Sequence, residues 1–316
     1  MRKVYLSTKD DVVGSIVDRH AVRCRSLMDA DIVIADGVIP SAATTLDVRL
    51  ASLYRKPTIM VVDKASAQPD DPLLALVSFA DLDERLTTFL ASPTKGSIIT
   101  FEGGDGTGKK TQTALLYERF LSQGIAVRTW SFPRYGAHHG QVIRRVLDGA
   151  YGGIDALDPA LFAGLYAEDR AAVAKGIAFW RDAGYHIILD RYAESNRIHQ
   201  AANAPEGSRE GLIASLDRWE HDVLGIPRSD AVIYLDLPPS HAHDAMDAQG
   251  RRKDILENDQ DHASNAYLIG MMLARRHGWK IIECLSDGVR ISPHGIHGRV
   301  ISAVGEYVPL ILEKTA

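Results

Sequence analysis

The chain has 316 residues, of which 46% are hydrophobic and 24% are charged. These proportions predict a packed fold and exclude a disordered chain, while the length suggests two domains. The net charge of −5 gives the protein as a whole no attraction to nucleic acid or to an anionic membrane, so any phosphate site must be built locally from a few Arg and Lys side chains.

Strand-like runs alternate with helix-length segments along the chain, which is the pattern of parallel sheets flanked by helices. In the first ninety residues the strand patterns are Lys3–Ser7, Asp31–Asp36 and Thr58–Asp63. Helical patterns lie at roughly 11–28, 42–55 and 72–91.

A short polar stretch with Pro and Gly, residues 92–96, is typical of a linker. A new series of strand patterns follows it, with helical segments between them and a last helical stretch near 293–313. These strands are Ser97–Glu102, Ala126–Phe132, His186–Asp190, Ala231–Leu237 and Lys280–Cys284. We therefore expect two α/β domains, residues 1–91 and 97–316.

A glycine-rich loop of the form G-x-x-x-x-G-K follows the strand that ends at Glu102. Its glycines let backbone N–H groups turn inward around a polyphosphate, at the positive end of the next helix. Lys109 would place its charge on the β- and γ-phosphates. Because Lys110 stands where the general motif has Ser or Thr for Mg²⁺, we expect acidic side chains from other loops to hold the ion. The predicted ATP-binding residues are Gly103, Gly104, Gly106, Thr107, Gly108, Lys109, Lys110 and Thr111.

Phe101–Gln112 resembles the first motif of thymidylate kinases, and four further segments follow in that family's order. The resemblance covers residues 96–316 and implies a P-loop NTPase fold, ATP and Mg²⁺ as cofactors, dTMP as acceptor and a homodimer. In the next segment, Ser131–Gly136, the family has an Arg that contacts the acceptor and transferring phosphates, which corresponds to Arg134. Phe132 and Tyr135 beside it are expected near dTMP.

Tyr166 and Arg170 are four residues apart in a predicted helix and so share one helical face. An aromatic ring beside a guanidinium can stack on a pyrimidine and bond its carbonyl edge. The family uses an aromatic residue and an Arg at these two places for thymine. The alternative is a core Tyr beside a surface salt bridge.

Asp190-Arg191-Tyr192 closes a predicted strand and resembles the family's D-R-Y motif. The resemblance implies that Asp190 holds Mg²⁺ or its waters, that Arg191 binds the acceptor phosphate and that Asn196 contacts the base. His199 and Gln200 lie where the family shapes the pocket against a ribose 2′-hydroxyl. A purely structural Asp–Arg pair at the strand end is the alternative.

Gly250–Glu257 resembles the mobile lid that closes over ATP and excludes water. Because the phosphate loop carries Gly106 rather than Arg, Arg251 or Arg252 would supply the transition-state charge. Glu257 matches the acidic residue that often follows the lid and is a candidate metal ligand. One Arg that the family has between Pro239 and Gly250 is missing here.

The implied reaction is ATP-dependent phosphorylation of dTMP to dTDP, in which the acceptor oxygen is already a nucleophile and catalysis consists of alignment and charge neutralisation. Lys109, Arg134, Arg191 and a lid Arg would supply that charge. Asp105 is expected at the acceptor's 3′-hydroxyl and is a further candidate near the metal. The alternatives are a kinase for other or modified pyrimidine deoxynucleotides, a nucleotide-binding sensor, and a salvage enzyme with two active domains.

The first domain resembles the nucleoside 2-deoxyribosyltransferase group, which includes deoxynucleotide N-hydrolases, in Ala30–Asp36, Pro40-Ser41, Asp47 and Lys56–Val62. The resemblance implies a flavodoxin-like parallel sheet. Asp47 stands where the group has a nucleophilic Glu, and its carboxylate is set back by roughly 1.5 Å, the length of a C–C bond. Covalent attack on a sugar carbon tolerates such displacement poorly. We favour a domain that binds nucleotide or only packs over a weak glycosidic-bond enzyme using Ser41 and Asp47.

The two cysteines, Cys24 and Cys284, are far apart and in no metal-ligand spacing. They fit a reducing compartment without disulfides. The chain's first residues lack the apolar core of a signal peptide, and no stretch is long enough to span a bilayer. We therefore expect a cytoplasmic protein.

Overall fold

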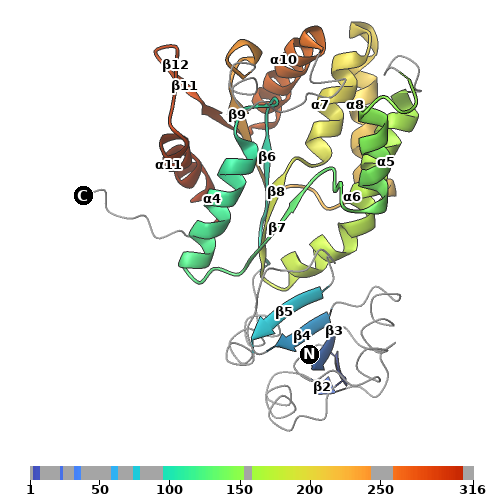
Figure 1. Ribbon diagram of the computed structural model, residues 1–316, viewed down its shortest axis with the longest axis vertical. Helices are drawn as coiled ribbons and strands as arrows, with labels where there is room; N and C mark the ends of the chain where they lie inside the picture. Colours follow the sequence, from blue (N-terminus) through green and yellow to red (C-terminus); the bar gives the residue numbers. More distant parts are fainter. Residues whose placement is uncertain are drawn as a thin grey trace. The chain divides into compact units, whose positions relative to one another are not determined.

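The computed structural model describes the chain in eight stretches. They are residues 3–7, 22–23, 32–36, 58–62, 74–78, 95–152, 159–242 and 259–308. The chain divides into two compact units, residues 1–96 with 176–184 and residues 97–175 with 185–316. Each unit contains its own parallel sheet (Figure 1).

The described residues of the first unit form five parallel strands in the order β2-β1-β3-β4-β5. They are β1 (Lys3–Ser7), β2 (Val22–Arg23), β3 (Ile32–Asp36), β4 (Thr58–Val62) and β5 (Leu74–Ser78). This is the strand order of flavodoxin-like sheets, as predicted. Val33, Ile34 and Ala35 are fully buried in the central strand β3, which fits a parallel sheet that is covered on both faces.

The helical prediction for residues 72–91 is wrong at its start, because Leu74–Ser78 forms strand β5 and pairs with β4 along its whole length. Val22–Arg23 likewise forms β2, inside the helical pattern predicted for 11–28. Short apolar runs carry no clear period, and pairing with a distant strand decides their conformation.

The second unit is built on a sheet with the order β10-β9-β6-β8-β7, all parallel. Its strands are β6 (Ile98–Glu102), β7 (Val127–Ser131), β8 (His186–Asp190), β9 (Ala231–Asp236) and β10 (Lys280–Glu283). All five match the predicted strands to within one residue at either end. A hairpin that was not predicted, β11 (Leu285–Ser286) with β12 (Val289–Arg290), follows β10.

Helices connect these strands and cover both faces of the sheet (Figure 1). They are α4 (Lys109–Ser122), α5 (His138–Leu147), α6 (Pro159–Asp182), α7 (Ala193–Asn203), a 3₁₀ turn (Glu206–Ser208), α8 (Arg209–Arg218), α10 (Gln260–His277) and α11 (Pro293–Val304). A π-helical turn, Trp219–Val223, directly continues α8, and the Leu224 N–H donates to the Trp219 carbonyl five residues back.

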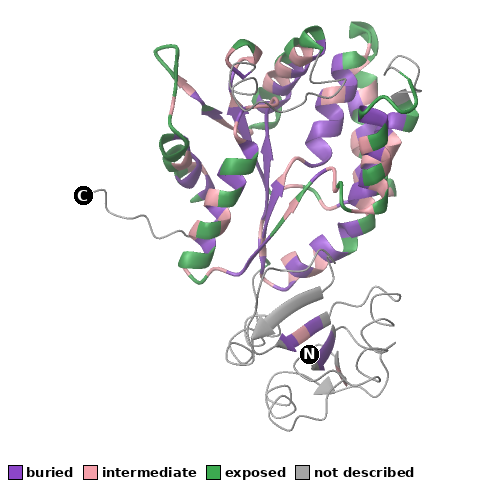
Figure 2. Ribbon diagram, viewed as in Figure 1, coloured by how far each residue is buried: buried purple, intermediate pink, exposed green. Residues whose placement is uncertain are grey.

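Two apolar cores lie on opposite faces of the second sheet, because side chains alternate along its strands. In β9, Ile233 and Leu235 join the core formed with α4 and α11. Tyr234, between them, joins the core formed with α7 and α10. Figure 2 shows the buried central strand β6 between these layers.

The register of the sheet brings the strand ends together at one edge. Phe101 of β6 pairs with Asp190 of β8, and Ser131 of β7 pairs with the same residue. Since ligands bind outside the carboxyl ends of parallel strands, the loops after β6, β7 and β8 form the candidate site.

Candidate active site

The loop between β6 and α4 turns sharply at glycines with positive φ, as the glycine pattern predicts, and its side chains bond to its own carbonyl groups. Gly103 has φ 139°, and a Cβ atom on it would lie 2.8 Å from the Leu235 carbonyl oxygen. Gly108, with φ 100°, turns the chain into α4. The Thr107 hydroxyl donates to the Gly104 carbonyl at 2.9 Å. The loop therefore directs the N-terminus of α4 toward the cavity described below.

Lys109 folds back over this loop, where its Nζ donates to the carbonyls of Gly103 at 2.8 Å and Gly104 at 2.6 Å. The side chain is only 7% exposed. Burial, followed by the positive charge of Arg191, lowers its pKa to about 8, and the carboxylate of Asp105 partly opposes this. The ammonium group is thus mostly charged at neutral pH and is held by two backbone carbonyls.

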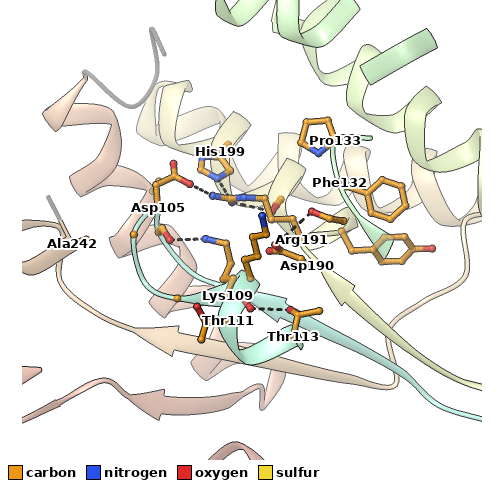
Figure 3. A pocket seen from close by; sticks show the side chains of 18 of the residues that line it. Asp105, Lys109, Thr111, Thr113, Phe132, Pro133, Asp190, Arg191, His199 and Ala242 are labelled. Carbon is orange, nitrogen blue, oxygen red and sulfur yellow. Dashed lines mark hydrogen bonds and ion pairs between the residues drawn. The ribbon is translucent and has the colours of Figure 1, made fainter. Parts of the chain in front are cut away.

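Arg191 holds the centre of the site. It follows β8 with φ 63°, a backbone region uncommon for residues other than glycine. Its guanidinium donates to Asp105 and lies 3.0 Å from His199 Nε2 (Figure 3). Burial alone would favour a neutral Asp105, yet the charges of Arg191 and Lys109 hold its pKa below the usual value.

Glu102 anchors the loop that carries Arg191, and the sequence analysis did not identify it. The Tyr192 N–H donates to Glu102 at 3.0 Å, and the Ser195 hydroxyl donates at 2.8 Å. Burial raises the pKa of this fully buried carboxyl to about 7, although the charge of Arg191 opposes the rise. An acidic residue inside an otherwise buried strand was the signal for this role.

A second buried ion pair, between Arg170 and Glu220, forms one wall of the site. Arg170 donates from Nε and from one terminal nitrogen to the two carboxylate oxygens, at 2.7 and 2.8 Å. Asn196 Nδ2 also donates to Glu220, at 2.8 Å, and to the Ala163 carbonyl. Asn196 Oδ1 is buried and has no hydrogen-bond partner among the described residues.

Lys109, Arg191, Arg170 and Asn196 line one cavity of about 1160 Å³, whereas Glu102 and Glu220 support them from behind. The residues predicted for dTMP all line it, namely Asp105, Phe132, Tyr135, Tyr166, Arg170, Arg191, Asn196, His199 and Gln200. Six of the predicted ATP-binding residues do so as well, namely Gly104, Gly106, Gly108, Lys109, Lys110 and Thr111. The other two, Gly103 and Thr107, belong to the same loop but do not line the cavity; each forms a hydrogen bond within the loop.

Arg134 differs from the other predicted cations. Its side chain forms an ion pair with the buried Asp169 at 3.1 Å, and its backbone N–H donates to the same carboxylate at 2.8 Å. Among the described arginines, Arg170, Arg191 and Arg290 line the cavity, whereas Arg134 does not. The structure thus brings Lys109 and Arg191 together and ties Arg134 to α6.

Arg290 is a cavity residue that the sequence analysis missed. It stands on β12, and its guanidinium donates to the Gly106 carbonyl in the phosphate loop at 2.7 Å. The separation of 184 residues between the two partners leaves no local sequence signal.

The candidate metal residue Asp190 lines the cavity at the end of β8, and its negative charge partly opposes the lowering of the Lys109 pKa by burial. The described residues contain no group of three or more His, Cys, Asp or Glu side chains placed to bind a metal. A single carboxylate still fits Mg²⁺, which is commonly bound by one or two carboxylates together with substrate phosphates.

The remaining predicted residues lie outside the described part of the chain. These are the lid residues Arg251, Arg252 and Glu257, and Ser41 and Asp47 of the first domain. Among the described helices, none is long and apolar enough to cross a membrane.

Sequence comparison relates the second unit to known proteins. The family model for thymidylate kinase matches residues 101–289. The chain belongs to the thymidylate kinase family. The matched residues include the phosphate loop, the Asp190-Arg191-Tyr192 motif and the segment that resembles a lid.

Several thymidylate kinases are similar to this chain. The one from Mycobacterium tuberculosis (strain H37Rv) is 31% identical over 188 residues, covering 58% of this chain and 87% of that protein. The one from a Synechococcus species is 31% identical over 215 residues, covering 67% and 96%. The solved thymidylate kinase of Candida albicans superposes with a TM-score of 0.52 at 18% identity, over 67% of this chain and 92% of that one, and supports the fold.

Proposed function

We propose that the protein transfers the γ-phosphoryl group of ATP to dTMP, yielding ADP and dTDP. One observation carries this proposal: a single cavity is lined both by the phosphate loop with Lys109 and by an aromatic wall with Arg170 and Asn196. Family membership supports the same activity. A donor triphosphate and an acceptor nucleotide can therefore lie in one continuous space.

The transfer requires no general base, because an oxygen of the dTMP phosphate attacks the γ-phosphorus while the bond to the ADP oxygen breaks. Lys109 would bind the β- and γ-phosphates. Arg191, 16% exposed and held by Asp105, would bind the acceptor phosphate. Preorganised cations stabilise the charge on the transferring group without reorganising during the reaction.

Magnesium would be held at Asp190, directly or through its waters. Bound there, it would neutralise charge on the donor phosphate oxygens. Asp105 already pairs with Arg191, so we assign it to the acceptor sugar rather than to the metal. Lid residues Arg251, Arg252 and Glu257 complete the proposal on grounds of family resemblance.

Base recognition would rest on Arg170 and Asn196. Glu220 occupies two of the five guanidinium N–H donors of Arg170, which leaves others for a pyrimidine carbonyl. Asn196 turns an unsatisfied Oδ1 acceptor to the same wall, and the N3–H of thymine is a matching donor. Phe132 and Tyr166 would pack against the ring.

Arg134 remains a proposed catalytic residue on grounds of resemblance. To reach a phosphate, its guanidinium would exchange the Asp169 carboxylate for phosphate oxygens. An Arg134→Ala variant that turns over dTMP at the wild-type rate would show that Arg134 serves only to hold α6.

The test is a coupled assay of ADP release with the full chain, ATP and Mg²⁺, across deoxy- and ribonucleoside monophosphates. We expect turnover with dTMP well above that with the other acceptors. A modified pyrimidine deoxynucleotide used much faster than dTMP would favour the alternative kinase. Tight ATP binding without acceptor-dependent turnover would favour a nucleotide sensor.

For the rest of the chain we propose a deoxyribosyltransferase-like domain at 1–91, a linker at 92–96 and a kinase domain at 97–316, in a cytoplasmic homodimer. Release of free base from deoxynucleotides by the full chain, lost in Asp47→Ala, would show that the first domain is catalytic. We expect no such release.

A further inference from the structure

A chain of hydrogen bonds leads from Arg191 across α7 to α10. Arg191 NH1 lies 3.0 Å from His199 Nε2 (Figure 3). His199 Nδ1 lies 3.1 Å from His262 Nε2, and the two ring planes differ by 23°. His262 Nδ1 in turn lies 2.6 Å from Asn203 Oδ1. Four side chains are thus linked in a single row.

The direction of every bond in this row follows from its first member. A guanidinium only donates, so His199 Nε2 must accept. A neutral imidazole then carries its hydrogen on Nδ1, which donates to His262 Nε2. By the same rule, His262 carries its hydrogen on Nδ1 and donates to the Asn203 carbonyl oxygen. Both rings are therefore neutral and in the Nδ1–H tautomer.

Protonation of either ring would break the row. A proton on His199 Nε2 would face the N–H of Arg191, and a proton on His262 Nε2 would face the N–H of His199. The groups around His199 oppose its protonation. Burial, then Arg191 from the end of β8 and His262 from α10, hold the pKa of His199 well below 6.5, while Asp105 acts in the opposite direction and Lys109 in the same one. The neutral state is thus the resting state at neutral pH.

Packing holds His262 in place at the far end of the row. The side chain is 6% exposed in the first turn of α10, where its backbone N–H donates to the helix-capping carboxylate of Asp259. Ile198 and Ala201 of α7 pack against Ile269 and Leu273 of α10 in one apolar cluster. The two helices therefore fix the distance between the rings.

Among the described residues Arg191 has three side-chain hydrogen-bond partners, and His199 makes a shorter contact with the NH1 group, 3.0 Å, than Ser195 does. Asp105 binds the NH2 group and is 41% exposed, while the Ser195 hydroxyl accepts from NH1 at 3.4 Å. The two histidine rings form the rigid side of this arrangement, because they stand on α7 and α10, which pack against one another. They fix the plane of the guanidinium, and a planar fork binds phosphate well only in one plane.

We propose that His199, His262 and Asn203 form a hydrogen-bond relay of fixed polarity that orients Arg191 toward the acceptor phosphate, which makes His262 a positioning residue for phosphoryl transfer. The relay rests on the proposed kinase function. It connects the helix after the candidate lid segment to the acceptor arginine.

The first experiment compares His262→Leu with His262→Gln in the full chain. Leucine fills the space but neither accepts nor donates, whereas glutamine can accept from His199 and donate to Asn203. We expect His262→Leu to raise the KM for dTMP or lower kcat so that kcat/KM falls about 5- to 50-fold, with the KM for ATP unchanged. His262→Gln should recover to within about threefold of wild type. Equal losses in the two variants, or none in His262→Leu, would overturn the relay.

Asn203→Asp gives a second readout at an exposed position that leaves the core intact. A carboxylate beside His262 stabilises the imidazolium, so the row should break at a higher pH. The acid limb of the kcat/KM profile for dTMP should therefore move up by about one pH unit. An unmoved acid limb would count against the relay.

Nitrogen-15 NMR of labelled histidines tests the polarity without any turnover. The rings of His199 and His262 should both show the Nδ1–H tautomer at pH 7.5, and His262→Leu, which removes the His262 signal, assigns it. Observation of Nε2–H in both rings would refute the assignment. A wild-type protein that shows the predicted tautomers but no dTMP-dependent ADP release would instead refute the proposed function.

Discussion

Glu220 lies between two buried donors, and its removal tests how the base pocket is held. The side chains of Arg170 and Glu220 are 2% and 1% exposed, with bonds of 2.7 and 2.8 Å between them. In Glu220→Ala the guanidinium would keep its charge and lose its counter-ion. Asn196 would lose one of its two acceptors and keep the Ala163 carbonyl.

Breaking a buried ion pair by removing one partner costs about 3–5 kcal/mol. Since a domain is stable by about 5–15 kcal/mol in total, Glu220→Ala should remain folded but be strongly destabilised. At about 2–4 °C per kcal/mol for a domain of this size, the melting temperature should fall by about 6–20 °C.

Calorimetry of the full chain measures this loss. The unfolding transition of the kinase domain is identified as the one whose melting temperature rises when ATP is added. Two further variants separate charge from volume. Glu220→Gln keeps the volume and one acceptor oxygen but removes the charge and turns an NH₂ group toward Arg170 or Asn196, so it should be destabilised nearly as much as Glu220→Ala, by about 3 kcal/mol. The double variant Arg170→Met with Glu220→Leu buries no charge and should melt near the wild type, yet its KM for dTMP should rise sharply. A Glu220→Ala melting point within 2 °C of wild type, a margin of about 1 kcal/mol or less, would refute the reasoning. So would a double variant as unstable as the single one.

Three other predictions concern the phosphate side of the cavity. Lys109→Ala should lower kcat by about 10²–10³-fold while circular dichroism is unchanged, and near-normal turnover would refute its role. Because the pKa of Glu102 rises from 4.5 to about 7, the folded state binds this proton more tightly than the unfolded state. The resulting stabilisation, on the order of 3 kcal/mol, is full below pH 4.5 and is lost as the pH rises to 7. Urea unfolding of Glu102→Gln should lack this slope, and a slope equal to that of wild type would assign it to another group. Arg290→Ala should raise the KM for ATP about 3- to 10-fold and leave that for dTMP unchanged. Arg299→Ala, an exposed variant on α11, is the matched control.

Local patterns account for what the sequence predicts correctly. The strand before Glu102, the glycine loop and the helix from Lys109 are all encoded within one short segment, so the phosphate loop is recognisable by itself. The same holds for the strand that ends at Asp190, where the D-R-Y motif stands.

Long-range partners account for what the sequence does not reveal. Glu220 meets Arg170 across 50 residues, and Arg290 meets Gly106 across 184. The pairing of Arg134 with Asp169 also depends on how α6 packs. Leu74–Ser78 was predicted as helix because its own sequence does not mark it as a strand. Its extended conformation goes with its pairing to β4, which lies earlier in the chain.

The π-helical turn at Trp219–Val223 has a consequence for how the base pocket can change. A π turn contains one residue more than the α-turn it replaces, and each residue of an α-helix rotates the following side chain by about 100°. Loss of that extra residue would swing a different side chain toward Arg170 and leave the guanidinium without its acceptor. Under the proposed function, deletion of one codon here would therefore change the support of the base pocket while Arg170 and Asn196 themselves stay unchanged.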